Sequence, residues 1–160
     1  LGCFMTDVMR ETTKSDIAFQ NPGGVRLSKL PAGKITAKDI YKMDPFDNII
    51  IKYKVSGQEI MDMLEMACYK TEDFPMFCSG CTCILHRNEY EEIESIEIVL
   101  DNGKPLDLKA KYNIAINSYM ASVYNFVEHK GKEFQHSNEM LFQYLEKRKH
   151  INYADVTRIR

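Results

Sequence analysis

An asparagine, two glycines and an arginine follow a short apolar run near the start of the chain and form a first candidate for ligand chemistry. Gly23 and Gly24 let a ligand approach the backbone closely, and Arg26 can donate charge-assisted hydrogen bonds to a phosphate. Together with Asn21 they suit a small anionic ligand. The same residues are also typical of a plain turn that carries a surface arginine, and this second interpretation stays open.

Five cysteines, three of them in the run Cys78-Ser79-Gly80-Cys81-Thr82-Cys83, form a second candidate site. The C-x-x-C pair is typical of zinc or redox sites, but zinc requires a second ligand pair and only His86 lies nearby. A redox pair usually opens a helix, whereas the residues around Cys83 have the composition of a strand. We therefore expect free structural thiols. A metal site, a redox site and, in an oxidising compartment, a Cys78–Cys81 disulfide remain as alternatives.

Residues for self-contained catalysis are not found in this sequence. The four histidines are scattered and form no H-x-H or H-E-x-x-H motif. No G-x-S-x-G, Walker or glycine-rich dinucleotide motif occurs. The glutamates between Glu89 and Glu94 are typical of a solvated loop. We therefore expect no catalytic residue and no cofactor in this chain.

Composition and charge narrow the function classes. The 160 residues contain 21 Lys and Arg against 23 Asp and Glu, a net charge of −2, which argues against a basic nucleic-acid surface. Hydrophobic residues make up 44% of the chain, as in globular proteins, and no apolar run approaches the ~18 residues of a membrane span. The chain begins inside a helical pattern without a secretory signal, as a piece of a longer precursor would.

The candidate residues must be positioned by helices and strands of one domain, which we expect to cover residues 1–160. Apolar spacing and capping boxes predict helices over 1–13, 36–41, 57–70 and 138–149. Apolar runs predict strands over 16–20, 49–55, 81–86, 95–100 and 112–117, and turns at 21–24, 30–33, 44–48 and 101–103. The third helix should end at 70–75. Paired strands set between helices favour an α+β fold with a mixed β-sheet and flanking helices.

These residues, taken in order, resemble the C-terminal domain of the 5'-nucleotidase family, which includes UDP-sugar hydrolases and 2',3'-cyclic-nucleotide phosphodiesterases. The resemblance covers nearly the whole chain. The matching segments are Leu1-Gly2, Thr6-Asp7-Val8-Met9-Arg10, Ser15-Asp16-Ile17-Ala18, Asn21 with Gly23-Gly24-Val25-Arg26, Gly33-Lys34-Ile35-Thr36, Asp44-Pro45-Phe46-Asp47-Asn48, Val55-Ser56-Gly57-Gln58-Glu59-Ile60, Leu64-Glu65, Phe77-Cys78-Ser79-Gly80, and a hairpin formed by Asn102-Gly103-Lys104-Pro105-Leu106-Asp107 and Tyr112-Asn113-Ile114-Ala115.

The resemblance implies a division of labour between two domains. In that family an N-terminal metallophosphatase domain holds two divalent metal ions and performs the hydrolysis, and the C-terminal α+β domain supplies the nucleoside pocket. The two aromatic side chains that sandwich the base match Phe46 and Tyr119. Asn21 matches an asparagine used on the base edge, and Arg26 an arginine that reaches phosphate or ribose. The resemblance thus implies a nucleotide or nucleoside ligand, a metallophosphatase domain as partner in cis or in trans, and export to the periplasm, cell surface or medium.

Two departures from the family pattern leave an alternative open. The family follows the second aromatic with Gly-Gly-Asp-Gly, whose aspartate holds the ribose hydroxyls. Asn125 stands at that place here and offers one acceptor oxygen rather than two. Pro22 replaces a further glycine. The first hypothesis is the substrate-recognition domain of a 5'-nucleotidase-type metallophosphoesterase. The second is a non-catalytic relative that acts as an interaction module or binds another planar ligand.

Overall fold

A computed structural model of the chain describes residues 1–30, 32–70, 76–148 and 150–160. Its helices are α1 (Gly2–Thr13), α2 (Ala37–Met43), α3 (Gly57–Lys70), α4 (Ser118–Val123) and α5 (Ser137–Lys147), with 3-10 turns η1 (Pro22–Gly24) and η2 (Phe126–Glu128). Its strands are β1 (Ile17–Gln20), β2 (Ile49–Ser56), β3 (Phe77–Ser79), β4 (Cys81–Arg87), β5 (Ile93–Leu100), β6 (Lys111–Asn117) and β7 (Lys132–His136). Positions 31, 71–75 and 149, which belong to a predicted turn, a predicted helix end and the last predicted helix, lie outside the described residues.

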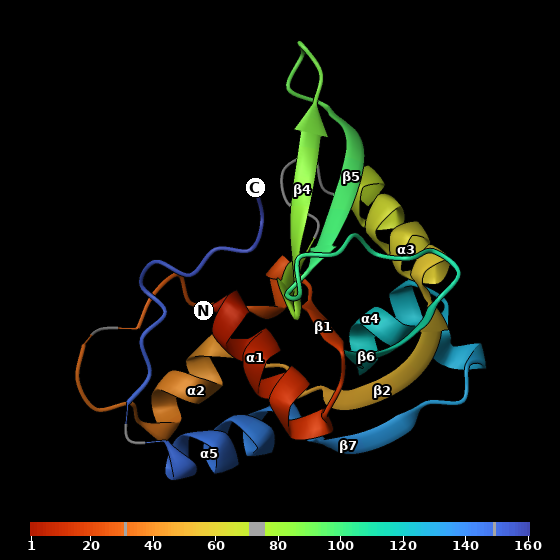
Figure 1. Cartoon of the computed structure of the whole chain (residues 1–160). Coiled ribbons are helices and arrows are strands. Elements are labelled where there is room, and N and C mark those ends of the chain that lie inside the picture. Colours follow the sequence, from red (N-terminus) through yellow and green to blue (C-terminus); the bar gives the residue numbers. More distant parts are fainter. Residues whose placement is uncertain (31, 71–75, 149) are drawn as a thin grey trace.

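Five strands form a mixed sheet in the order β3-β1-β6-β2-β7 (Figure 1). β1 and β6 run parallel, with Ile17 opposite Ile114, and the other neighbours are antiparallel. β4 and β5 form a separate two-stranded ribbon that extends away from this sheet. The predicted α+β fold with a mixed sheet and flanking helices is confirmed.

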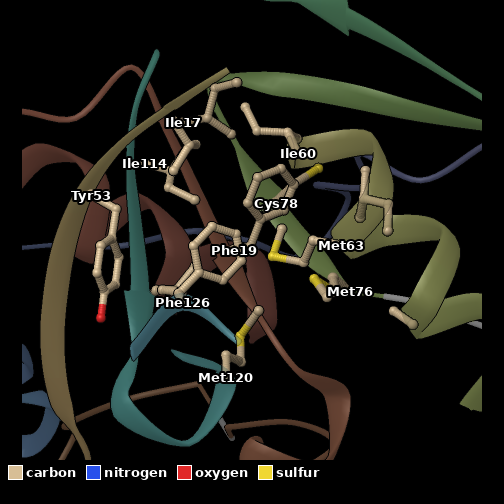
Figure 2. Packing of buried hydrophobic residues seen from close by; sticks show 14 of the residues in the cluster. Ile17, Phe19, Tyr53, Ile60, Met63, Met76, Cys78, Ile114, Met120 and Phe126 are labelled. Carbon is tan, nitrogen blue, oxygen red and sulfur yellow. The ribbon is translucent and has the colours of Figure 1, made fainter. Parts of the chain in front are cut away.

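Helices cover both faces of the sheet, and strand alternation divides the core into two halves. Phe19 and Ile114 point to the face that Met63 of α3 covers. The alternate residues Ala18 and Ala115 point to the opposite face, where α1, α2 and α5 pack. Figure 2 shows the first half of the core, with side chains of the sheet interleaved with those of α3. Within the described ranges, no helix is both long and hydrophobic enough to cross a membrane.

Local sequence signals fix the helix ends. Both predicted capping boxes are present: the Thr36 N–H donates to Asp39 Oδ2 at 2.8 Å, and the Ser56 N–H donates to Glu59 Oε2 at 2.6 Å. These bonds start α2 and α3. α1 ends at Thr13, as predicted.

The sequence patterns missed β3, β7 and α4, all of which are short. The predicted turn after β5 is present, with Gly103 at φ 79 and its N–H donating to Leu100 O at 2.8 Å. The chain follows β5 only to Leu106 and then crosses to the main sheet, where β6 pairs with β1 and β2. The hairpin expected between residues 102–107 and 112–115 is therefore wrong as a pair of strands. The apolar segment Ile114-Ala115-Ile116 is buried on both faces and needs a central position in the main sheet.

Candidate functional site

Three of the predicted ligand residues, Asn21, Phe46 and Tyr119, lie on segments that meet at one edge of the main sheet. β1 ends directly before Asn21, and β6, which is parallel to it, ends two residues before Tyr119. β2 runs antiparallel to β6 and begins three residues after Phe46. The three segments therefore reach the same edge, beyond the carboxyl ends of the parallel strands, where open sheets commonly bind ligands.

The side chain of Asn117 joins the ends of β1 and β6. Its Nδ2 donates to Asn21 Oδ1 at 2.9 Å and to Gln20 Oε1 at 3.1 Å. Its Oδ1 accepts the Met120 N–H at 2.8 Å and so caps α4, the helix that carries Tyr119. The Oδ1 of Asn21 accepts the hydrogen bond from Asn117. The Nδ2 of Asn21 is therefore the group that this side chain can offer to a ligand.

The two glycines after Asn21 have different roles. Gly24 is buried, and a Cβ atom there would lie 2.2 Å from Gln20 Nε2 and 3.0 Å from Asn21 Oδ1. Gly23 is exposed, and the nearest atom to a Cβ there would be Asn21 Nδ2 at 3.6 Å. Gly24 thus makes room for the amide network, and only Gly23 leaves its backbone open to a ligand.

Phe46 and Arg26 lie against each other. The guanidinium carbon of Arg26 is 5.1 Å from the centre of the Phe46 ring, within the range of a cation–π interaction. The Arg26 N–H donates to Met43 O at 2.8 Å, which ties this residue to the end of α2. The Phe46 side chain is 50% exposed, so the ring keeps a surface for a ligand.

Asp44 anchors the loop that presents Phe46. Its buried carboxylate accepts the Phe46 N–H at 3.3 Å and the hydroxyl of Ser137, the first residue of α5. Burial raises the pKa of Asp44, although the hydrogen bonds from Ser137 and the backbone oppose this rise. A buried carboxylate therefore links the Phe46 loop to α5.

Asn48 connects the same loop to α4. Its Oδ1 accepts the Ser118 hydroxyl at 3.1 Å, and its backbone O accepts the Ser137 N–H at 2.8 Å. Ser118 precedes Tyr119, whose side chain is 54% exposed. Phe46 and Tyr119 are thus two half-exposed aromatic residues on segments in direct contact.

Asn125 lies apart from this cluster. It is exposed, has φ 59 and follows the end of α4 opposite to Tyr119. Tyr119 lies in the first turn of α4, which has six residues and is about 9 Å long, and Asn125 follows the other end of this helix. In the part of the chain that the structure describes, no hydrogen bond joins the Asn125 side chain to Asn21, Arg26 or Phe46.

Comparison with known proteins decides the family. The sequence profile described as "5'-nucleotidase, C-terminal domain" matches residues 1–128. The chain belongs to the 5'-nucleotidase C-terminal domain family. The resemblance inferred from the motifs is confirmed.

Individual proteins are also similar in sequence or structure to this 5'-nucleotidase C-terminal domain. The 5'-nucleotidase of Vibrio parahaemolyticus is 34% identical over 122 residues, covering 76% of this chain and 21% of the relative. The NAD 5'-nucleotidase of Haemophilus influenzae is 30% identical over 146 residues, covering 82% of this chain and 24% of that relative. The crystal structure of the 5'-nucleotidase precursor from Thermus thermophilus superposes with a TM-score of 0.82 at 26% identity, covering 99% of this chain and 34% of that chain. The chain thus spans about a fifth to a quarter of the length of these curated relatives.

Three positioning residues of this 5'-nucleotidase C-terminal domain were missed by the sequence reasoning: Asn117, Asp44 and Ser137. Asn117 could have been found, because an asparagine that ends an apolar strand and precedes a serine is a helix N-cap signal. Asp44 and Ser137 are 93 positions apart, so no local sequence pattern predicts the hydrogen bond between them.

Proposed function

We propose that this domain recognises the substrate of a 5'-nucleotidase-type metallophosphoesterase, holding the nucleoside while a separate metal-bearing domain hydrolyses the phosphate ester. The observation that carries the proposal is the convergence of two half-exposed aromatic residues, Phe46 and Tyr119, on anchored segments at one sheet edge. An aromatic side chain contributes ~1–3 kcal/mol by stacking on a base and tolerates different bases.

Each residue of the cluster has a role in this proposal. The base lies between Phe46 and Tyr119, and the Nδ2 of Asn21 donates to an acceptor on the base edge. Arg26, held beside Phe46, donates to phosphate or ribose. Asn125 is assigned to the sugar end of the ligand, at the far end of α4.

The hydrolytic chemistry belongs to the partner domain in this proposal. Two divalent metal ions there would activate the attacking water and neutralise the developing charge. This chain binds and orients the nucleotide, and the site described above needs no metal. Its relatives are named 5'-nucleotidases, which supports a role in nucleotide breakdown. The family resemblance favours an exported protein, in the periplasm, at the cell surface or secreted.

One observation favours a second candidate function. Asn125 stands apart from the cluster, and bulky residues occupy the neighbouring positions 123, 124 and 126. A domain that has lost the sugar contact could serve as a non-catalytic interaction module, or bind another planar ligand.

Thermal unfolding of the 160-residue chain separates the two candidates. Adenosine, AMP, UMP, UDP-glucose and NAD are added in turn at millimolar concentration. A ligand at 100 times its Kd stabilises the folded state by about 2.7 kcal/mol, which raises the melting temperature measurably. A rise in melting temperature with any of these ligands supports nucleotide recognition. If none of the five raises it, the non-catalytic relative is supported.

A further inference from the structure

Three buried cysteines meet where β3 passes into β4, outside the proposed nucleoside site. The sulfur atoms of Cys78, Cys81 and Cys83 all lie within 4.8 Å of one another, and those of Cys78 and Cys83 are 3.8 Å apart. All three side chains are fully buried. Figure 2 shows Cys78 in the core beside Phe19 and Ile60.

Strand alternation and one glycine bring these thiols together. Cys81 and Cys83 are two residues apart on β4 and therefore share a face of the strand. Gly80, at φ 86, turns the chain so that this face meets Cys78 of β3. His86 falls on the opposite face of β4 and is therefore not a ligand of this cluster. The relevant spacing is C-x-x-C-x-C with its last two members on a strand.

We propose that Cys78, Cys81 and Cys83 form a structural site for a divalent thiophilic metal ion of the zinc class. A Zn–S bond length of ~2.3 Å places neighbouring sulfur ligands of a tetrahedral site about 3.8 Å apart. The observed separations need only small side-chain movements to reach this value. Three thiols are also more than a disulfide requires, since a disulfide would leave the third sulfur unused.

Charge favours a divalent ion over a monovalent one. Binding converts three thiols and M²⁺ into M(S–Cys)₃⁻ with the release of three protons, which leaves one negative charge. Copper(I) bound to the same three thiolates would leave two negative charges, and uncompensated charge in a buried site is costly. The guanidinium of Arg158 lies beside the cluster, donating to Cys78 O at 3.2 Å while it pairs with Asp7 at 2.9 Å.

An oxygen ligand for the fourth position lies on the C-terminal segment. The backbone O of Arg158 is 3.7 Å from Cys78 Sγ, close to the ~3.6 Å expected between sulfur and oxygen ligands of one zinc ion. The same oxygen accepts the Cys83 N–H at 2.8 Å. A bound metal would thus tie β3, β4 and the C-terminal segment together.

The test uses the whole chain, reduced and freed of metal by a chelator that is then removed. Titration with Cd²⁺ is followed by thiolate-to-metal charge-transfer absorption, and Zn²⁺ is titrated in competition with a colorimetric chelator. We expect about one ion per chain, and a higher melting temperature in the presence of Zn²⁺.

Single substitutions assign the ligands. Cys81→Ser should abolish the charge-transfer band. Cys3→Ser and Cys68→Ser are the matched controls, because these two thiols lie outside the cluster, and both variants should keep the band. If Cys81→Ser does not fold, alkylation of the unmodified chain in moderate urea replaces it: Zn²⁺ should protect Cys78, Cys81 and Cys83 and leave the other two thiols reactive.

Three results would overturn the proposal. One is the failure of the reduced chain to bind Cd²⁺ or Zn²⁺. Another is a charge-transfer band that depends on Cys3 or Cys68. The last is a disulfide within the cluster in the purified protein, seen as a loss of two hydrogens in its mass. None of these results bears on nucleotide recognition, which rests on other residues.

Discussion

The amide network beside the proposed nucleoside site requires glycine at position 24, because a Cβ atom does not fit there. Gly24→Ala would press on the buried Gln20 amide, which lies 2.2 Å from the new atom, and so displace Asn21. We expect the free energy of unfolding to fall by ~1–3 kcal/mol, measured by urea denaturation. Gly23→Ala is the matched control and should change stability by less than ~0.5 kcal/mol. Equal effects at the two positions would contradict the role given to Gly24.

Arg26 should distinguish nucleotides from nucleosides. Arg26→Gln removes the charge-assisted hydrogen bonds to phosphate, which are worth ~1.5–3 kcal/mol. The preference for AMP over adenosine, measured by calorimetric titration of both ligands, should therefore fall by about tenfold or more. Lys29→Gln removes a charge from an exposed residue of the same segment and should leave the preference unchanged. An unchanged preference in Arg26→Gln would show that this arginine does not contact phosphate.

The Phe46 loop is held to α5 by the carboxylate of Asp44, whose charged form is disfavoured by burial. Ser137→Ala removes a hydrogen bond to Asp44, so the pKa of Asp44, already raised by burial, should rise further. A carboxyl group whose folded pKa is raised destabilises the fold as the pH rises above its unfolded value of ~3.9. The loss of stability in the variant should therefore be ~1–2 kcal/mol near pH 8 and shrink toward pH 4.

The matched control for this prediction is Ser118→Ala. Ser118 donates to the neutral amide of Asn48 in the same region, so its loss of stability should not depend on pH. Denaturation curves of both variants across this pH range make the comparison. A loss in Ser137→Ala that is the same at every pH would contradict the role of Asp44.

An ion pair between Asp7 and Arg158 joins α1 to the C-terminal segment. Asp7 of α1 accepts hydrogen bonds from Arg158 at 3.0 Å and Tyr153 at 2.8 Å, and from Ser79 of β3. Burial would raise the pKa of Asp7, but these hydrogen bonds outweigh it and lower the pKa. The Asp7 carboxylate therefore stabilises the fold at neutral pH, and this contribution is lost as the pH falls through the lowered pKa.

Arg158→Gln should lower the free energy of unfolding by ~1–3 kcal/mol at pH 7. The difference from the unmodified chain should close in acid, because a protonated Asp7 no longer attracts the guanidinium. Hydrogen exchange should also speed up at the Cys83 amide, which donates to the Arg158 carbonyl. Arg160→Gln, at an exposed position, serves as the control. An unchanged stability of Arg158→Gln would show that α1 and the C-terminal segment are not coupled through this pair.

The sequence predicted the elements whose signals are local. α1, the two capping boxes and β2 follow from apolar spacing and from hydrogen-bonding side chains three residues apart. The pairing of β6 and the short strands β3 and β7 depend on partners distant in the chain, so no local pattern fixed them. The same holds for the site. Motifs indicated Phe46 and Tyr119, but only the tertiary structure revealed the Asp44–Ser137 and Asn48–Ser118 bonds that position them.

Calorimetric titration of the chain with AMP tests whether Phe46 and Tyr119 hold the base. Phe46→Leu and Tyr119→Leu should each weaken binding by about 5- to 150-fold, because each removes one stacking contact of ~1–3 kcal/mol. Tyr90→Leu, which alters a 74% exposed tyrosine on the β4–β5 loop, should stay within about twofold of the unmodified chain. AMP affinity that is unchanged in both Phe46→Leu and Tyr119→Leu, or no binding to the unmodified chain at millimolar AMP, would contradict base binding by these two residues.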